Sequence, residues 1–223
     1  MKNSLIFFFL FLSMAIFSQK DSLQIGDRYW EDQLYLNVTF NTLTNQPNKI
    51  DKNTFSFGFS AGYIKDIPLV KSGKMAIGIG LGYAIDSFNL NVEAVKEYSD
   101  NLHLNYMITA NKLKTHTLEI PIQFRLRTST QNSFSFWRLY TGINFSYNLS
   151  NTFSYTDDTI KAVDVLNSAS YNKFQTGLTL SSGYKTFNFH VYYGLTPLLK
   201  NAFSNGGRVR SNIVRFGLAF YLL

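Results

Sequence analysis

Six charged or titratable side chains stand at alternating positions of segments that have the pattern of β-strands. They comprise one carboxylate, four guanidinium groups and one imidazole: Glu119, Arg125, Arg127, Arg138, His190 and Arg215. Such groups could form a buried ion-pair network, line an anion-selective pore or ligand site, or support catalysis. Buried charges persist only when they are paired. We therefore favour a hydrogen-bonded network in which Glu119 pairs with one or more of the arginines.

The rest of the sequence gives little support to catalysis or to a bound cofactor. Of the three histidines, His103 and His116 have no Ser or Asp partner at a recognisable catalytic spacing. The chain contains no cysteine, which excludes disulfides and thiolate-bound zinc. It also lacks the glycine-rich phosphate-binding, zinc-protease and EF-hand motifs. We predict no catalytic residue, no cofactor and no metal site. A small gated pore or ligand-binding barrel is the second hypothesis, and an enzyme is the third.

The polar groups belong to eight segments in which apolar and polar residues alternate, as they do in β-strands with two different faces. The segments are 33–41, 55–65, 75–86, 115–127, 137–149, 174–185, 187–195 and 212–222. Their length is close to the roughly 9–11 residues of a tilted strand that crosses a bilayer. With 45% hydrophobic and 16% charged residues, the chain is too apolar to be disordered. We expect an all-β fold, an eight-stranded antiparallel up-and-down transmembrane β-barrel.

The direction of the apolar face separates a membrane barrel from a water-soluble, lipocalin-like one. Away from the segment ends, the apolar faces carry no Asp, Glu, Lys or Arg. A basic side chain on a lipid-facing surface would cost up to about 2–4 kcal/mol at mid-membrane. The strand glycines fall on the polar face, where a narrow interior needs small residues beside arginine and tyrosine. Both observations predict that the apolar face meets lipid.

The connections between the segments alternate in length. Long connections cover 42–54, 87–114, 150–173 and 196–211, and the three others are short. Outer-membrane barrels have short periplasmic turns and long external loops, so an even number of strands returns both termini to the periplasm. Four aromatic residues near the expected periplasmic rim suit an interfacial girdle: Tyr63, Trp137, Tyr184 and Phe187.

The N-terminus predicts export. Lys2 precedes an apolar run that ends at Phe17, and Ser18 then provides a small residue before a polar start. This is the pattern of a secretory signal peptide. The run is shorter than the roughly 17–25 residues of a transmembrane helix. We predict a signal peptide over 1–18, a periplasmic N-terminal segment over 19–32 and the outer-membrane β-barrel over 33–223.

The net charge of +7 does not indicate nucleic-acid binding, because an exported membrane protein does not meet nucleic acid in its compartment. Several arginines fall on the interior face. Many other cations fall in the expected external loops, where they can pair with the anionic groups of lipopolysaccharide: Lys49, Lys52, Lys96, Lys112, Lys114, Lys161, Lys173, Lys200, Arg208 and Arg210. The expected partners are outer-membrane lipid, lipopolysaccharide and other outer-membrane or periplasmic proteins.

Four stretches carry a family resemblance: 26–35 (GDRYWEDQLY), 64–68 (IKDIP), 118–125 (LEIPIQFR) and 136–142 (FWRLYTG). Together they resemble the PorT-type outer-membrane β-barrel proteins of Bacteroidota, and the likeness covers essentially the whole mature chain. The resemblance implies an accessory barrel in an outer-membrane complex, since the family is named after a component needed for type IX secretion and gliding. It transfers no catalytic residue. Within the third stretch, Pro121 has no N–H for a strand ladder, so we expect a bulge or kink beside Glu119.

Overall fold

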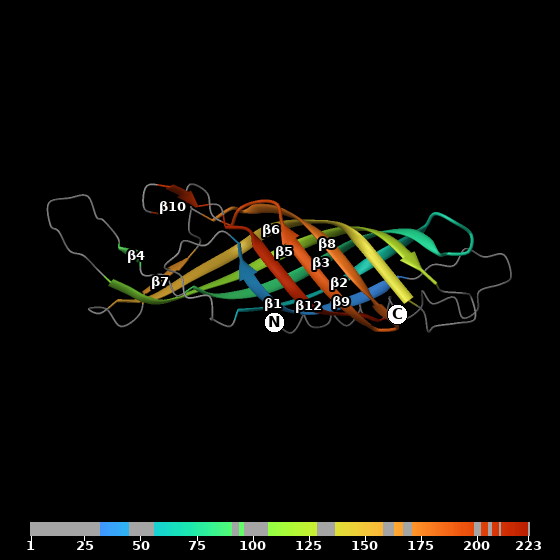
Figure 1. Ribbon diagram of the computed structural model, residues 1–223, viewed down its shortest axis with the longest axis horizontal. Coiled ribbons are helices and arrows are strands. Elements are labelled where there is room, and N and C mark those ends of the chain that lie inside the picture. Colours follow the sequence, from blue (N-terminus) through green and yellow to red (C-terminus); the bar gives the residue numbers. More distant parts are fainter. Residues whose placement is uncertain are drawn as a thin grey trace, which may run out of the picture.

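The computed structural model describes residues 32–44, 56–90, 94–95, 107–128, 137–157, 163–166, 171–198, 202–204, 207–209 and 211–222. In these ranges eight antiparallel strands form a closed barrel (Figure 1): β1 (Gln33–Leu43), β2 (Phe57–Pro68), β3 (Met75–Leu90), β5 (Met107–Arg127), β6 (Trp137–Asp157), β8 (Phe174–Tyr184), β9 (Phe187–Gly194) and β12 (Ile213–Leu222). Each barrel strand pairs with its neighbour along the chain, and β12 pairs with β1 to close the ring. The predicted all-β, eight-stranded barrel is confirmed.

Four short strands lie beyond the barrel at one end. β4 (Ala94–Val95) pairs with β5, and β7 (Val163–Leu166) pairs with β6. β10 (Ala202–Ser204) and β11 (Gly207–Val209) form a separate hairpin. Figure 1 shows β4, β7 and β10 gathered at this end, which we call the long-loop end. The links from β2 to β3 and from β8 to β9 lie at the opposite, short-turn end. Within the described ranges, no helix has the length and apolarity to cross a membrane.

Barrel strands extend far into two of the connections that the sequence predicts as loops. The expected loops over 87–114 and 150–173 are too long, because β3 continues to Leu90, β5 already begins at Met107 and β6 continues to Asp157. β5 and β6 pair along this extension as far as Ile108 and Asp157. The extended part of β5 contains Lys112 and Lys114 and has no continuous apolar face. Hydrophobic alternation therefore cannot reveal these ends of the strands.

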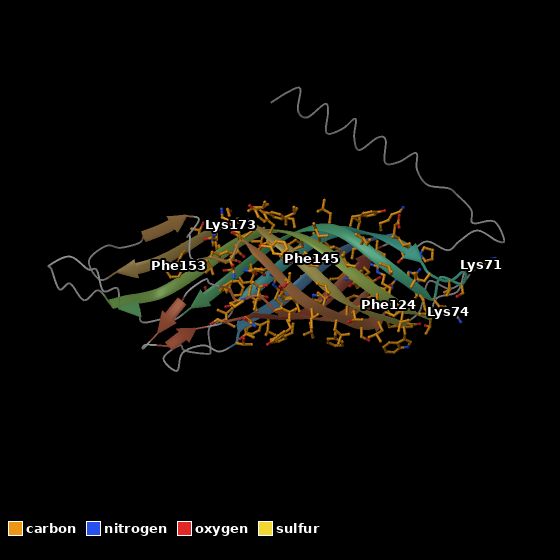
Figure 2. All side chains as sticks on the ribbon, turned by 90° about the horizontal axis from the view of Figure 1, so that it is seen from above. Lys71, Lys74, Phe124, Phe145, Phe153 and Lys173 are labelled. Carbon is orange, nitrogen blue, oxygen red and sulfur yellow. The ribbon has the colours of Figure 1, made fainter. Side chains whose placement is uncertain are left out.

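The outer surface of the barrel is apolar, as expected for a barrel that meets lipid. Many large hydrophobic side chains on it are 37–76% exposed. They include Phe59, Ile120 and Leu180, and Figure 2 shows side chains projecting all around the strands. The inward positions carry buried polar and charged groups instead. This arrangement is the reverse of a water-soluble barrel, and it agrees with the predicted direction of the two faces.

Aromatic side chains gather on the outer surface at the short-turn end. The rings of Trp137 and Tyr184 lie 5.7 Å apart, and those of Phe187 and Phe220 lie 5.3 Å apart. At the same end, Asp32 accepts hydrogen bonds from Tyr63 (2.6 Å), from Lys65 (2.8 Å) and from the Asp66 N–H (2.9 Å). Partial burial raises the pKa of Asp32, but these donors hold that pKa below its usual value. The start of β1 is thus tied to the end of β2.

Glycine makes room for large interior side chains, and Gly82 gives a test of this. A Cβ atom at Gly82 would overlap the hydroxyl of buried Tyr35 and would lie 3.0 Å from the Ala61 carbonyl oxygen. We expect Gly82→Ala to lower the free energy of unfolding by roughly 1–3 kcal/mol through overpacking. Gly194→Ala is the matched control, because its Cβ would come no closer than 3.1 Å to any atom. Equal losses in urea unfolding of the two variants would contradict this packing.

Candidate functional site: the barrel interior

Near the short-turn end the interior holds one carboxylate between two guanidinium groups. Asp66 on β2 accepts from Arg125 at 2.9 Å and from Arg127 at 2.7 Å, and all three side chains are fully buried. Arg125 and Arg127 are two residues apart on β5, so their side chains lie on the same, inward face of the strand. Arg127 also donates to the Gly73 carbonyl in the turn between β2 and β3. We call Asp66, Arg125 and Arg127 the turn-end cluster. Its formal charge is +1, from two guanidinium groups and one carboxylate.

A second cluster lies near the middle of the barrel and joins three strands. Arg215 on β12 donates to Asp86 on β3 at 2.6 Å and to Glu119 on β5 at 2.9 Å. The other oxygen of Asp86 accepts from Asn41 at 2.7 Å, and the guanidinium carbon of Arg215 lies 4.6 Å from the centre of the Tyr192 ring. We call Asp86, Glu119 and Arg215 the central cluster. Its formal charge is −1.

A layer of tyrosines separates the two clusters. It is a buried group made of Tyr35, Ile64, Tyr140, Ala219 and Tyr221. The rings of Tyr140 and Tyr221 meet edge to face at 5.2 Å. Arg125 of the turn-end cluster stacks on Tyr140 at 4.6 Å, whereas Tyr35 and Tyr221 face the cavity beside the central cluster. We refer to these five residues as the tyrosine layer.

An apolar cap closes the interior toward the long-loop end. Six buried side chains form it, and Leu43 and Phe153 pack against them: Phe88, Leu113, Tyr171, Tyr192, Leu198 and Ile213. Tyr171 and Leu198 come from segments outside the barrel strands. These segments are fastened to each other and to the barrel, since Asn172 N–H donates to the Leu198 carbonyl at 3.0 Å and Leu198 N–H donates to the Ser211 carbonyl at 2.8 Å. Figure 2 shows this end of the barrel with Phe153 and Lys173 labelled.

Between the tyrosine layer and the apolar cap lies a small polar cavity, which we call the central cavity. Its volume is about 30 Å³, which is space for roughly two water molecules. The central cluster lines it together with Tyr35, Asn37, Asn144, Thr179, His190, Tyr192 and Tyr221 among others.

The comparison with protein families agrees with this architecture. A family described as "Outer membrane protein beta-barrel domain" matches residues 17–200, which is more than half of the chain. The chain belongs to this family. Membership makes it an outer-membrane β-barrel protein, and it assigns the bacterial outer membrane as the location.

Solved structures that match the chain include other outer-membrane barrels. Ail, the attachment invasion locus protein of Yersinia pestis, crystallised with the heparin analogue sucrose octasulfate, is 11% identical; the match covers 86% of this chain and 99% of Ail, with a TM-score of 0.37. A double mutant of the Rh. blastica porin is 8% identical, covers 87% of this chain and 100% of the porin, and has a TM-score of 0.16. No curated protein matches the sequence.

All six interior residues predicted from the sequence are buried in this outer-membrane barrel, but they do not form one network. Glu119 forms its ion pair with Arg215, whereas Arg125 and Arg127 pair with Asp66. The two remaining side chains stand outside both clusters. The Arg138 guanidinium donates to the Lys185 carbonyl, and His190 lines the central cavity.

Two carboxylates of the interior are missing from the sequence-based prediction. Glu119 was expected to be the lone strand carboxylate, yet Asp66 and Asp86 also point inward and are buried. Asp66 lies just past the predicted end of its segment, and Asp86 ends the next one. Their even numbering matches the polar face of both strands. Following the even positions to the last residue of one segment, and one residue past the end of the other, would have found them.

The bulge expected at Pro121 lies elsewhere. Pairing of β5 with β6 is unbroken from Thr117 to Arg127, and its register shifts between His116 and Thr117 instead. On the β3 side, pairing is absent opposite Ile120 and Pro121 but resumes in the same register at Ile79. Loss of the proline donor therefore interrupts one ladder without inserting a residue.

Proposed function

We propose that this outer-membrane barrel is a closed, non-conducting structural or accessory subunit of a larger outer-membrane assembly. The observation that supports this role is the filled interior. The turn-end cluster, the tyrosine layer, the central cluster and the apolar cap follow one another along the axis, and the central cavity has a volume of about 30 Å³. A barrel without a continuous water path acts through its outer surface and its loops.

The orientation of the barrel in the outer membrane is part of the same proposal. Short periplasmic turns and long external loops would place the short-turn end and both termini in the periplasm. The signal peptide over 1–18 would direct export. That segment and nearly all of 19–32 lie outside the described residues. Lys114 and Lys173 are exposed at the long-loop end, where lipopolysaccharide phosphates would meet them. Lys112, in β5, is half-buried. The remaining expected loop cations, including Lys49, lie outside the described residues or belong to side chains that are not described.

The resemblance to PorT-type proteins suggests the kind of assembly, a complex that serves type IX secretion. Co-purification of the tagged protein from native membranes in mild detergent tests this role. We expect a stoichiometric partner, and we expect its loss when residues 96–106 and 158–162 are replaced by Gly/Ser segments of equal length. The control measurement is the mobility of the loop variant on unheated gels, which should show that its barrel still folds. Recovery of the barrel alone from native membranes would contradict the accessory role.

A planar-bilayer measurement separates the closed barrel from the alternative of a small gated pore or ligand-binding barrel. We expect wild-type protein to give no stable conductance, because buried ion pairs and two apolar layers occupy the lumen. A general porin inserted under the same conditions serves as the positive control. A robust, long-lived wild-type channel would favour the pore instead. We propose no catalytic role for any of the interior residues.

A further inference from the structure

The central cavity has an unbalanced charge. Its described lining contains two carboxylates, Asp86 and Glu119, and one guanidinium, Arg215, which pairs with both. With His190 neutral, the group carries a formal charge of −1. All four side chains are more than nine-tenths buried. The excess positive charge of the turn-end cluster lies across the tyrosine layer. A buried net charge is costly unless a counter-charge lies close to it.

Unpartnered oxygen atoms face the same cavity. The hydroxyl groups of Tyr35 and Thr179 and the side-chain carbonyl oxygens of Asn37 and Asn144 have no hydrogen-bond partner. Each of these residues is at least nine-tenths buried. They come from β1, β6 and β8, so they approach the cavity from different sides of the barrel. Buried acceptors without a partner are destabilising. Hydroxyl, amide and carboxylate oxygens are the ligands of hard cations.

We propose that the central cavity binds one small monovalent cation of the size of Na⁺. A single positive charge balances the central cluster, and a cavity of about 30 Å³ excludes organic cations. A divalent ion fits less well, because the described residues contain no group of three or more His, Asp or Glu that could hold it. Arg215 Nε also has no partner, and the positive charge of this guanidinium would oppose a second positive charge. This site does not depend on the accessory role.

The thermal stability of the full-length barrel in detergent tests the site. NaCl is compared with choline chloride at equal ionic strength, because choline is too large for the cavity while it screens surface charges equally. We expect the melting temperature to rise with sodium by roughly 3–5 °C per tenfold increase above the dissociation constant. Equal melting temperatures in the two salts at every concentration would overturn the proposal. A response to pH alone, without a sodium response, would assign the counter-charge to a proton and would also overturn it.

Two variants locate the site. Thr179→Val removes one oxygen without changing charge, so we expect the sodium response to need at least about tenfold more salt. Thr117→Val is the matched control, since Thr117 is an inward, buried threonine that does not line the cavity. Glu119→Gln removes the excess negative charge and should abolish the response. If it does not fold, sodium-23 NMR relaxation decides: the wild type should broaden the signal and Thr179→Val should not. An unchanged response in Thr179→Val would overturn the site.

Discussion

Replacing Asp66 by asparagine is expected to lower the free energy of unfolding by about 3–5 kcal/mol, the cost of removing one partner from a buried ion pair. Asp66 serves two partners, because Arg125 and Arg127 both donate to it and all three side chains are fully buried. Asparagine preserves the shape of the carboxylate but leaves two guanidinium charges side by side in a closed interior. Urea unfolding in lipid vesicles, followed by the loss of the fast-migrating band on unheated gels, measures the effect.

Asp32→Asn is the matched control for this variant. It is the same chemical change at the same end of the barrel, but the Asp32 side chain is 30% exposed and its Lys65 partner is 53% exposed. Exposed pairs contribute only about 0–1 kcal/mol. Glu119→Gln should fall between the two, because Arg215 keeps Asp86 as a partner. Equal stability of Asp66→Asn and wild type would contradict the role of Asp66 as the anchor of the turn-end cluster.

Leu180→Arg is expected to reduce folding into bilayers by about 2–4 kcal/mol, the cost of an arginine on the lipid face at mid-membrane. Leu180 is 49% exposed on the outer surface. It pairs with Thr141 on one side and with Val191 on the other, in the middle of both ladders. The folded fraction after dilution from urea into vesicles, read from the unheated gel band, gives the size of the loss.

Leu195→Arg is the control for the depth of the substituted residue in the membrane. Leu195 is also 49% exposed, but it follows the end of β9 at the long-loop end. An arginine near the interface costs only about 0–1 kcal/mol, because its head group reaches water and phosphate. Similar folding of the two variants would argue that the outer surface does not lie in lipid. Recovery of the wild type as a soluble monomer would argue the same.

The strands were predictable because a membrane barrel gives every strand two different environments. β9 was expected over 187–195 and runs over Phe187–Gly194, and β12 was expected over 212–222 and runs over Ile213–Leu222. Successive residues of a strand face lipid and the polar interior in turn, so apolar and polar residues must alternate along the sequence. Where β5 and β6 extend past the barrel, the pairing continues but the alternation weakens. The sequence therefore does not reveal those ends.

The contents of the interior were only partly predictable. The alternation along a strand predicts which side chains point inward, but it does not predict which other strand supplies the ion-pair partner of each one. Asp66 was missed because Ile64, the inward residue before it, is apolar and ended the visible pattern. The apolar cap was missed for a different reason. Tyr171 and Leu198 lie in connecting segments without periodicity, and only the tertiary fold brings them against Phe88.

The seam between β1 and β12 has a consequence for the order of assembly. All other barrel strands pair with a neighbour in sequence, but at this seam Thr44 and Asn212 exchange hydrogen bonds across 168 positions. Hairpins can form locally and early, whereas joining the chain ends must overcome the entropy of closing a long loop. Arg215 arrives only with the last strand, so Asp86 and Glu119 have no ion-pair partner in the central cluster until that moment. We therefore expect ring closure and the formation of these two ion pairs to occur in one late, cooperative step. A chain stalled before this step would keep two open strand edges and two central carboxylates without their arginine partner.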